Sequence, residues 1–189
     1  MKRLKPFYIQ NRFFYACITI MVLFIISFVL PKWFNIVKLL LLCLLALTFL
    51  DALILFATKK GLKGSRNLSE KFSNGDQNPI QLTLENFYTF SVYAQIIDEI
   101  PEQFQARDFK IDRKLKASSK TELQYELRPT ERGEYHFGKL NIYITSTFGL
   151  IARRFSFNDK AMIPTYPSFI QLRKYDLLAI SNNKRVCFR

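Results

Sequence analysis

The sequence predicts a membrane α-hairpin followed by an all-β domain, which we expect to be an immunoglobulin-like antiparallel β-sandwich with a short C-terminal helix. Three observations support this fold class. Two long apolar segments lie close together near the N-terminus of the 189-residue chain. Apolar and polar residues alternate from about residue 79 onward. A shorter segment after residue 167 has the apolar spacing of one helical face.

The first transmembrane helix is expected at residues 13–30, which contain no charged residue. A helix of this length just crosses a hydrocarbon core of roughly 30 Å. Basic residues precede this segment, as in a cleaved signal peptide, but no small-residue cleavage site follows it before Pro31. The second transmembrane helix is expected at residues 39–57, after an external turn at 31–38. So short a turn predicts an antiparallel hairpin.

Basic residues predict how the hairpin is oriented. Four lie in the N-terminal segment, residues 1–12, and four follow the second helix, whereas only two lie in the turn. The side with more Lys and Arg is normally cytoplasmic, so we expect both termini and the β-domain on the cytoplasmic side of the inner membrane. An extracytoplasmic β-domain is the alternative that this count opposes.

The positive charge of the chain is concentrated next to the predicted helices. Residues 1–66 carry ten basic residues and one acidic residue, whereas residues 67–189 carry 18 and 14. This distribution favours anionic lipid headgroups over nucleic acid as the partner of the charge. We expect these headgroups to lie near Lys59, Lys60, Lys63 and Arg66.

Residues 58–78 are rich in Lys, Gly, Ser and Asn, and are expected to form a basic linker. The β-sandwich is expected at residues 79–167, with about seven strands. Its one-sided strands are clearest where Leu123, Tyr125 and Leu127 alternate with acidic and amide side chains. Such strands have one face in a core and one in water, which is typical of antiparallel sandwiches.

The alternation changes phase at Gly138-Lys139. The apolar residues before this point, Tyr135 and Phe137, are odd-numbered, whereas Leu140 and Ile142 are even-numbered. One inserted residue restores the phase, so a β-bulge with Gly138 in a left-handed conformation is expected here.

The C-terminal segment is expected to be a short helix at residues 168–181, followed by a frayed tail at 182–189. Ser168 and Gln171 have the spacing of a capping box. Of the three cysteines, Cys17 and Cys43 lie in the predicted membrane helices and Cys187 lies near the end. No disulfide framework or CxxC metal site follows from these positions.

Few residues of the chain are suited to catalysis. His136 is the only histidine, so no zinc site or Cys–His pair can be drawn, and its place between Tyr135 and Phe137 predicts a side chain that points out of the sheet. Arg153 and Arg154 are candidates for a phosphate clamp, but neighbouring strand residues point to opposite faces, which favours a solvated sheet edge. We expect no enzymatic activity, no cofactor and no metal.

Asp51 is the exception that needs an explanation, because an acid within a transmembrane helix is costly. It lies six residues before the cytoplasmic end at Ala57, and Thr19 lies six residues after the start of the first helix at Phe13. The two residues therefore have matching depth. We expect an intramembrane polar pair between Asp51 and Thr19 that packs the hairpin, and regard proton or ion conduction as the alternative.

The second half of the chain contains an ordered set of short motifs. An RGEYHFGKLNI stretch is followed by STFGL, by two arginines and by a TYP strand. This order resembles the N-terminal half of bacterial membrane proteins of the domain of unknown function 58 family, and the resemblance covers nearly the whole chain. The matched residues, which the resemblance implies to be structural, are Arg132, Gly133, Tyr135, Gly138, Leu140, Ile142, Phe148, Gly149, Leu150, Tyr166 and Pro167.

The resemblance implies a two-helix membrane anchor, a β-sandwich and, by association, a MoxR-type AAA+ ATPase as a partner in envelope-related assembly. Ser146-Thr147 stands where many relatives have Asp-Pro, which predicts a looser turn. The von Willebrand factor A-like module that follows in the family is missing, and the tail at 182–189 differs from the family's continuation. A gene fragment or frameshift would explain both differences.

These observations favour a non-enzymatic, membrane-anchored scaffold or adaptor, in a truncated form, whose cytoplasmic β-domain mediates protein contacts. The alternative is the anchor and spacer of a larger membrane-bound enzyme whose catalytic part lies downstream.

Overall fold

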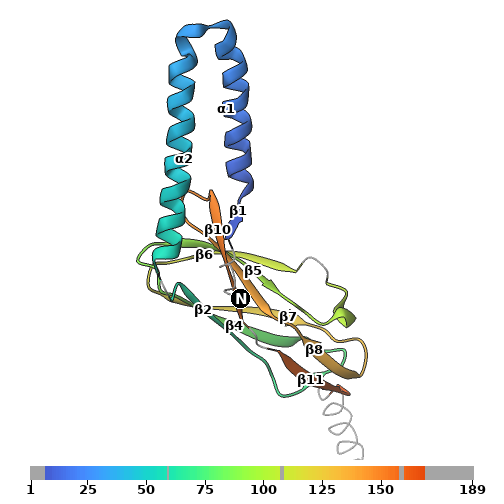
Figure 1. The fold of residues 1–189 in the computed structure, drawn as a ribbon. Coiled ribbons are helices and arrows are strands. Elements are labelled where there is room, and N and C mark those ends of the chain that lie inside the picture. The colour runs from blue at the N-terminus through green and yellow to red at the C-terminus, as the bar shows by residue number, and fades with distance from the viewer. Residues whose placement is uncertain (1–6, 59, 107–108, 158–159, 169–189) are drawn as a thin grey trace, which may run out of the picture.

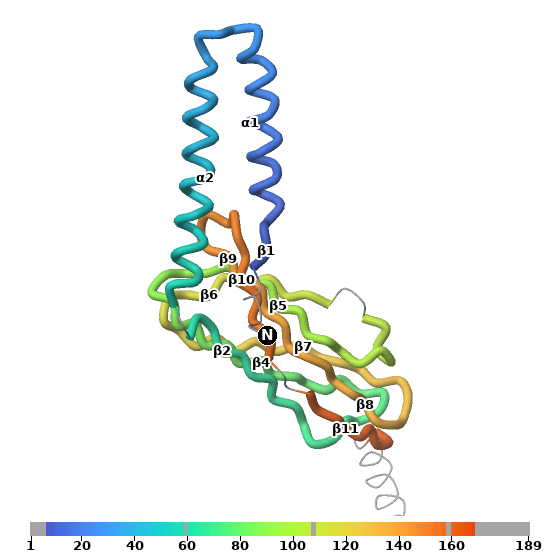
Figure 2. The backbone as a smooth tube through the Cα atoms, viewed as in Figure 1, coloured from blue at the N-terminus to red at the C-terminus, as the bar shows by residue number. Residues whose placement is uncertain are grey.

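The computed structural model describes residues 7–58, 60–106, 109–157 and 160–168. A long helical hairpin stands on one end of a β-sandwich (Figure 1). The backbone trace shows the turn between strands β9 and β10 rising beside the base of the hairpin (Figure 2). The two apolar helices and the sandwich confirm the coarse fold class. The expected C-terminal helix at 168–181 and the tail at 182–189 lie almost entirely outside the described residues.

Helix α1 is Asn11–Val29 and helix α2 is Phe34–Ala57, joined by the one-turn helix η1, Pro31–Trp33. Both are long and apolar enough to cross a membrane. Helix α2 begins five residues earlier than the predicted 39–57, and the turn is shorter than the predicted 31–38. Pro31, which has no N–H to donate, occupies the first position of η1 and stops α1.

The sandwich has three sheets. Five strands pair in the order β1-β10-β9-β5-β6, three in the order β2-β4-β7 and three in the order β3-β11-β8. All pairs are antiparallel except the short β3–β11 pair. The strands are β1 Phe7–Ile9, β2 Leu62–Asn67, β3 Phe72–Ser73, β4 Asn78–Asn86, β5 Val92–Asp98, β6 Lys110–Leu115, β7 Lys120–Leu127, β8 Gly133–Phe137, β9 Leu140–Thr145, β10 Ile151–Phe157 and β11 Ala161–Tyr166.

The N-terminal segment and the predicted linker belong to the sandwich, which corrects two of the expected boundaries. Strand β1 lies within residues 1–12 and pairs with β10. Strands β2 and β3 lie within residues 58–78. The composition of this segment was misleading because Gly64 is required for packing: a Cβ there would lie 2.9 Å from Ile142 Cδ1. After the hairpin, the domain therefore begins at Leu62, 17 residues before the predicted residue 79.

The phase change at Gly138 is real, but its cause is not the predicted bulge. Strand β8 belongs to the sheet with β11, and β9 belongs to the five-stranded sheet, so the chain crosses between sheets at Gly138-Lys139. Gly138 has no left-handed backbone. It is needed for space, because an added Cβ would lie 2.7 Å from Glu99 Cβ.

The sandwich contains two apolar clusters. The larger one lies between the five-stranded sheet and β2-β4-β7, reaches the base of α2 through Leu55, and includes Leu84, Ile96 and Ile142. The smaller one, at the end of the domain far from the hairpin, contains Phe72, Ile80, Leu127, Tyr135, Phe137 and Ile163. Helix α2 thus shares a core with the sandwich.

Candidate functional site at the junction of the hairpin and the sandwich

The side chain of Asp51 joins helix α2 to the turn between β9 and β10. Its Oδ1 accepts a hydrogen bond from the Ser146 hydroxyl, and its Oδ2 accepts one from each of the backbone N–H groups of Leu150 and Ile151, both at 3.1 Å. Asp51 is completely buried. A buried carboxylate is tolerated only when its oxygens are satisfied, and here the sandwich supplies all three donors.

Ser146 completes this arrangement. Its hydroxyl donates to Asp51 and accepts a hydrogen bond from the backbone N–H of Phe148 at 3.1 Å. Whether Ser146-Thr147 makes this turn looser than Asp-Pro would stays a prediction. The hydroxyl bonds to the helix and to its own turn at the same time, so this turn is held from both sides.

The predicted pair between Asp51 and Thr19 is corrected by these contacts. Thr19 Oγ1 donates to the carbonyl of Tyr15, one turn earlier in its own helix, at 2.9 Å. Such back-bonding satisfies a hydroxyl without any interhelical partner. Asp51 was correctly chosen as an unusual residue, but its partners lie about 95 to 100 residues away in the sequence, where helix depth gives no information.

Arg153 caps the C-terminus of helix α2. Its Nη1 donates to the carbonyl oxygens of Leu55 and Thr58, at 2.7 and 2.9 Å. The last carbonyls of a helix have no partner within the helix and carry a partial negative charge, so a guanidinium is favourable here. The solvated edge predicted for Arg153 is thus wrong, since the side chain is buried and β1 covers that edge of β10.

Tyr88 supports the same helix end. Its hydroxyl donates to the carbonyl of Leu55 at 2.8 Å and accepts a hydrogen bond from Arg153 Nη1 at 3.2 Å. Burial raises the pKa of the Tyr88 hydroxyl, and the charge of Arg153 opposes this shift. The hydroxyl therefore stays a neutral donor at physiological pH.

Aromatic rings enclose the Arg153 guanidinium. Its Cζ lies 5.1 Å from the ring centroid of Phe56 and 4.6 Å from that of Phe155. Cation–π contacts at these distances stabilise a charge that has left water. Gly61, which has φ +57°, lets the chain turn sharply after α2, and a Cβ there would lie 2.5 Å from the ring of Phe155.

Arg154 lies on the opposite face of β10, as the strand alternation predicts. It bonds the side-chain oxygen of Asn141 at 2.8 Å and the Tyr8 hydroxyl at 3.3 Å, and lies 5.8 Å from the ring centroid of Tyr143. The two arginines therefore form no common clamp. Arg153 binds the helix end, whereas Arg154 bonds the Tyr8 side chain of the edge strand β1 on the outer face of the sheet.

A buried ion pair lies between the two apolar clusters of the domain. Arg66 Nη1 pairs with Asp98 Oδ1, both side chains are fully buried, and Tyr125 donates to Asp98 Oδ2 at 2.6 Å. Burial raises the pKa of the Asp98 carboxyl, against the effect of the Arg66 charge. The expected lipid contact of Arg66 is wrong, because β2 directs this side chain inward. Lys60 and Lys63 are exposed, and Lys59 lies outside the described residues.

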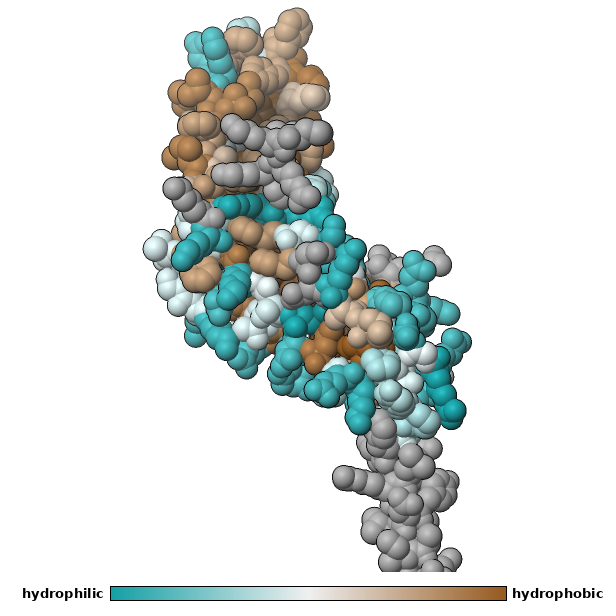
Figure 3. Space-filling model, turned by 60° about the horizontal axis from the view of Figure 1, so that its bottom comes forward, coloured by the Kyte–Doolittle hydropathy of each residue, from teal (hydrophilic) through white to brown (hydrophobic). Residues whose placement is uncertain are grey.

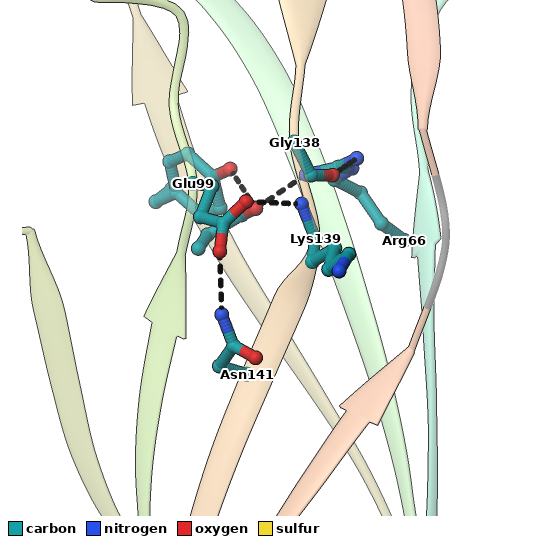
Figure 4. A network of polar contacts seen from close by, with 7 residues as sticks. Arg66, Glu99, Gly138, Lys139 and Asn141 are labelled. Carbon is teal, nitrogen blue, oxygen red and sulfur yellow. Dashed lines mark hydrogen bonds and ion pairs between the residues drawn. The ribbon is translucent and has the colours of Figure 1, made fainter.

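Glu99 holds the crossing from β8 to β9 beside this pair (Figure 4). Its carboxylate accepts hydrogen bonds from the backbone N–H of Lys139 and from the Asn141 side chain, both at 2.8 Å. Arg66 Nη2 donates to the carbonyl of Gly138 at 3.0 Å. The crossing is thus fixed by polar contacts from two other segments.

Four of the motif residues lie at buried or tightly constrained positions. The Tyr135 hydroxyl donates to the carbonyl of Glu131 at 2.9 Å, the hydrogen bond of a tyrosine corner. Gly149 has φ +67° in the turn that Asp51 binds. Leu140 and Ile142 lie in the larger apolar cluster. Exposed or partly exposed positions are occupied by Arg132, Gly133, Gly138, Phe148, Leu150, Tyr166 and Pro167.

The described residues show no catalytic constellation. His136 is exposed, as expected, and lies 3.7 Å from Glu134. No group of three His, Cys, Asp or Glu side chains within the described ranges could hold a metal ion. The candidate site is therefore a structural junction, consisting of Asp51, Tyr88, Ser146 and Arg153. Sequence reasoning missed Ser146 and Tyr88. In the sequence, Ser146 looks like an ordinary turn residue, and Tyr88 looks like an ordinary strand residue.

No family model and no curated protein matches the chain. Among solved structures, it is similar to a PapD-like domain of human CEP192, with 12% identity over 59% of this chain and 90% of that one, at a TM-score of 0.42. It is also similar to a CARDB domain from Pyrococcus furiosus, with 10% identity over 56% of this chain and 87% of that one, at a TM-score of 0.37. At TM-scores this low, the assignment of a sandwich depends on the strand pairing described above.

Proposed function

We propose that the chain is a two-span protein of the bacterial inner membrane that holds a β-sandwich in a fixed orientation on the cytoplasmic side, as a non-enzymatic scaffold for protein contacts. The observation that carries this proposal is the junction, in which Asp51 and Arg153 bond helix α2 to the sandwich at two separate points. A flexible tether would need neither contact.

The dimensions of the hairpin agree with a membrane anchor. Helix α1 has 19 residues, or about 29 Å, and residues 34–50 of α2 span about 26 Å. Both lengths suit a hydrocarbon core of roughly 30 Å. Residues 51–57 then extend below the hydrocarbon into the sandwich, so Asp51 lies at the membrane surface, where burying it in protein avoids exposing a charge to lipid.

The surface of the molecule also divides into an apolar part on the hairpin and a polar part on the β-domain. The hairpin is predominantly hydrophobic and the domain is mostly hydrophilic, as the space-filling view shows (Figure 3). Large apolar side chains are exposed along both helices, with Phe28 88% and Ile25 67% exposed. Surfaces of this size need a lipid or protein environment.

The partner that the family resemblance suggests is a MoxR-type AAA+ ATPase. In the test, the full chain and a chain lacking residues 60–168 are reconstituted in liposomes and incubated with the MoxR-type ATPase of the same genome. We expect the ATPase to float with liposomes that carry the full chain and to stay in solution with the hairpin alone. Equal flotation with both would overturn the scaffold proposal.

The orientation has its own test. A Glu122→Cys variant in which the native cysteines are replaced by serine has one thiol on the exposed face of β7. An impermeant maleimide should label it in inverted membrane vesicles and not in intact cells. Labelling in intact cells would place the domain outside the cytoplasm.

A further inference from the structure

A polar groove lies on the outer face of the five-stranded sheet, beside the first turn of helix α1. Its volume is about 610 Å³. Its walls come from the start of α1, from strands β5 and β6 and from the β9–β10 turn. The lining residues that the argument uses are Arg12, Tyr93, Asp112, Arg113, Lys114 and Gly149.

Two cations stand on different walls of this groove. On the sheet side, Lys114 pairs with Tyr93 across β5 and β6, and its Nζ lies 5.4 Å from the Tyr93 ring centroid. On the helix side, Arg12 lies against Gly149, where an added Cβ would be 3.0 Å from Arg12 Nη1. The glycine therefore leaves room for the guanidinium beside the turn.

The groove has an excess of positive charge. Three of its lining residues are basic and one, Asp112, is acidic. Within the described ranges, the ion pairs are Arg66–Asp98, Lys120–Glu122 and His136–Glu134, so none of them neutralises Arg12, Arg113 or Lys114. An anion in this groove would meet a guanidinium and an ammonium that no carboxylate occupies, which is the chemistry that binds phosphate.

The position of the groove identifies the source of the phosphate. The backbone N–H of Gln10 donates to the carbonyl of Leu150 at 3.0 Å, so the start of α1 is level with the turn that Asp51 binds. Under the proposed anchoring, this is the level of the cytoplasmic headgroups. Phe148, 50% exposed in the same turn, has the character of an interfacial aromatic anchor.

We propose that this groove binds the phosphate of an anionic phospholipid headgroup, with Arg12 and Lys114 as its principal ligands. The proposal rests on the proposed membrane anchoring and adds a lipid class to it. A zwitterionic lipid has the same phosphate but carries a compensating cation, so phosphatidylglycerol should be preferred over phosphatidylcholine.

The test uses the full chain in nanodiscs made of equal parts phosphatidylglycerol and phosphatidylcholine. Native mass spectrometry then counts the lipids that remain bound after release from the disc. We expect the unmodified chain to retain phosphatidylglycerol, and the Arg12→Gln/Lys114→Gln variant to lose about tenfold in occupancy, since it removes two charge-assisted contacts. The matched control is Lys110→Gln, on the same strand and the same face but outside the groove.

Three results would overturn the site. The first is equal retention of both lipids. The second is an equal loss of phosphatidylglycerol with Lys110→Gln, which would indicate diffuse attraction. The third is displacement of phosphatidylglycerol by millimolar inorganic phosphate, which would indicate a site for a free anion. In parallel, the same protein variants are reconstituted in liposomes, and their flotation is measured. A chain that fails to float would overturn the anchoring, whereas a chain that floats without lipid preference would overturn the lipid site alone.

Discussion

The molecule buries an aspartate and an arginine in two places, and uses them differently. Between the two apolar clusters, Arg66 and Asp98 pair with each other. At the junction, Asp51 and Arg153 are each satisfied mainly by backbone groups of the other element: sandwich N–H groups for the aspartate and helix carbonyls for the arginine. A direct pair compensates its own charges within one domain. The crossed arrangement satisfies each charge only while helix and sandwich stay docked.

This difference predicts that substitutions at the internal pair reduce stability without moving the domain, whereas substitutions at the junction release the domain from the helix. The junction should also depend on each residue separately, since neither charge serves the other. The predictions below separate these two behaviours.

The largest expected effect is that of Arg66→Leu, which leaves Asp98 buried without its cation. We expect the free energy of unfolding of the sandwich to fall by about 4 kcal/mol. Thermal unfolding in detergent, followed by near-UV circular dichroism, measures this loss. The double variant Arg66→Leu/Asp98→Leu should recover most of it, because it removes both charges together. A double variant as unstable as the single one would contradict the direct pairing.

The next effect is that of Asp51→Asn. The asparagine keeps the size of the side chain but replaces one acceptor oxygen by a donor, which faces donors of the β9–β10 turn. We expect a loss of about 3 kcal/mol in the docking of α2, as buried donors lose their acceptor. Limited proteolysis at the β9–β10 turn should accelerate accordingly. Thr19→Val is the matched control, since the earlier hypothesis places the partner there, and it should leave proteolysis unchanged.

A smaller effect is expected for Tyr88→Phe. Only the hydroxyl that bonds the Leu55 carbonyl is removed, while Arg153 still caps the helix, so the loss should be about 1 kcal/mol. The ring itself is kept, so its packing against Phe90, at 5.2 Å between ring centroids, should not change. A loss as large as that of Asp51→Asn would show that the phenol, and not the arginine, holds the helix end.

The smallest effect is a pH dependence at Asp98. Burial raises its folded pKa above the ordinary value of 3.8, so the folded state binds a proton more readily than the unfolded chain. The contribution of Asp98 to stability should therefore fall as pH rises from about 3.8 through the raised folded pKa. The difference in melting temperature between the unmodified chain and Asp98→Asn isolates this slope. A slope of the opposite sign would contradict the dominance of burial over the Arg66 charge.

The sequence predicted the elements better than their contacts. The two apolar segments and the alternating residues define helices and strands locally, so the hairpin and most strands were expected. The linker prediction is wrong because a glycine-rich composition indicates flexibility, whereas Gly64 makes room for the side chains of Ile142 and Phe157 in the facing sheet. The phase change at Gly138 was detected, but a sequence pattern cannot distinguish a bulge within one strand from a crossing between sheets.

The junction was beyond prediction for a related reason. The cost of an acid in an apolar segment marked Asp51 as unusual, and the helix-depth rule then suggested a partner in the neighbouring helix. Its true donors include two backbone N–H groups, which any sequence has. The sequence predicts an exposed Arg153 because the strand that covers β10 comes from the N-terminal segment. Its Phe7, 146 residues earlier in the chain, is the register partner of Arg153. Only the three-dimensional arrangement contains this information.

The most direct test of the fixed junction is a distance between the hairpin and the domain. Spin labels are attached at the native Cys43 of α2, which is exposed, and at Glu122→Cys on β7, with Cys17 and Cys187 replaced by serine. Double electron–electron resonance in nanodiscs should give one narrow distance distribution. The additional pair of substitutions Asp51→Asn and Arg153→Met should broaden it, whereas Arg66→Leu/Asp98→Leu should not. A distribution that is already broad in the labelled parent, or that the junction substitutions leave unchanged, would contradict the rigid junction.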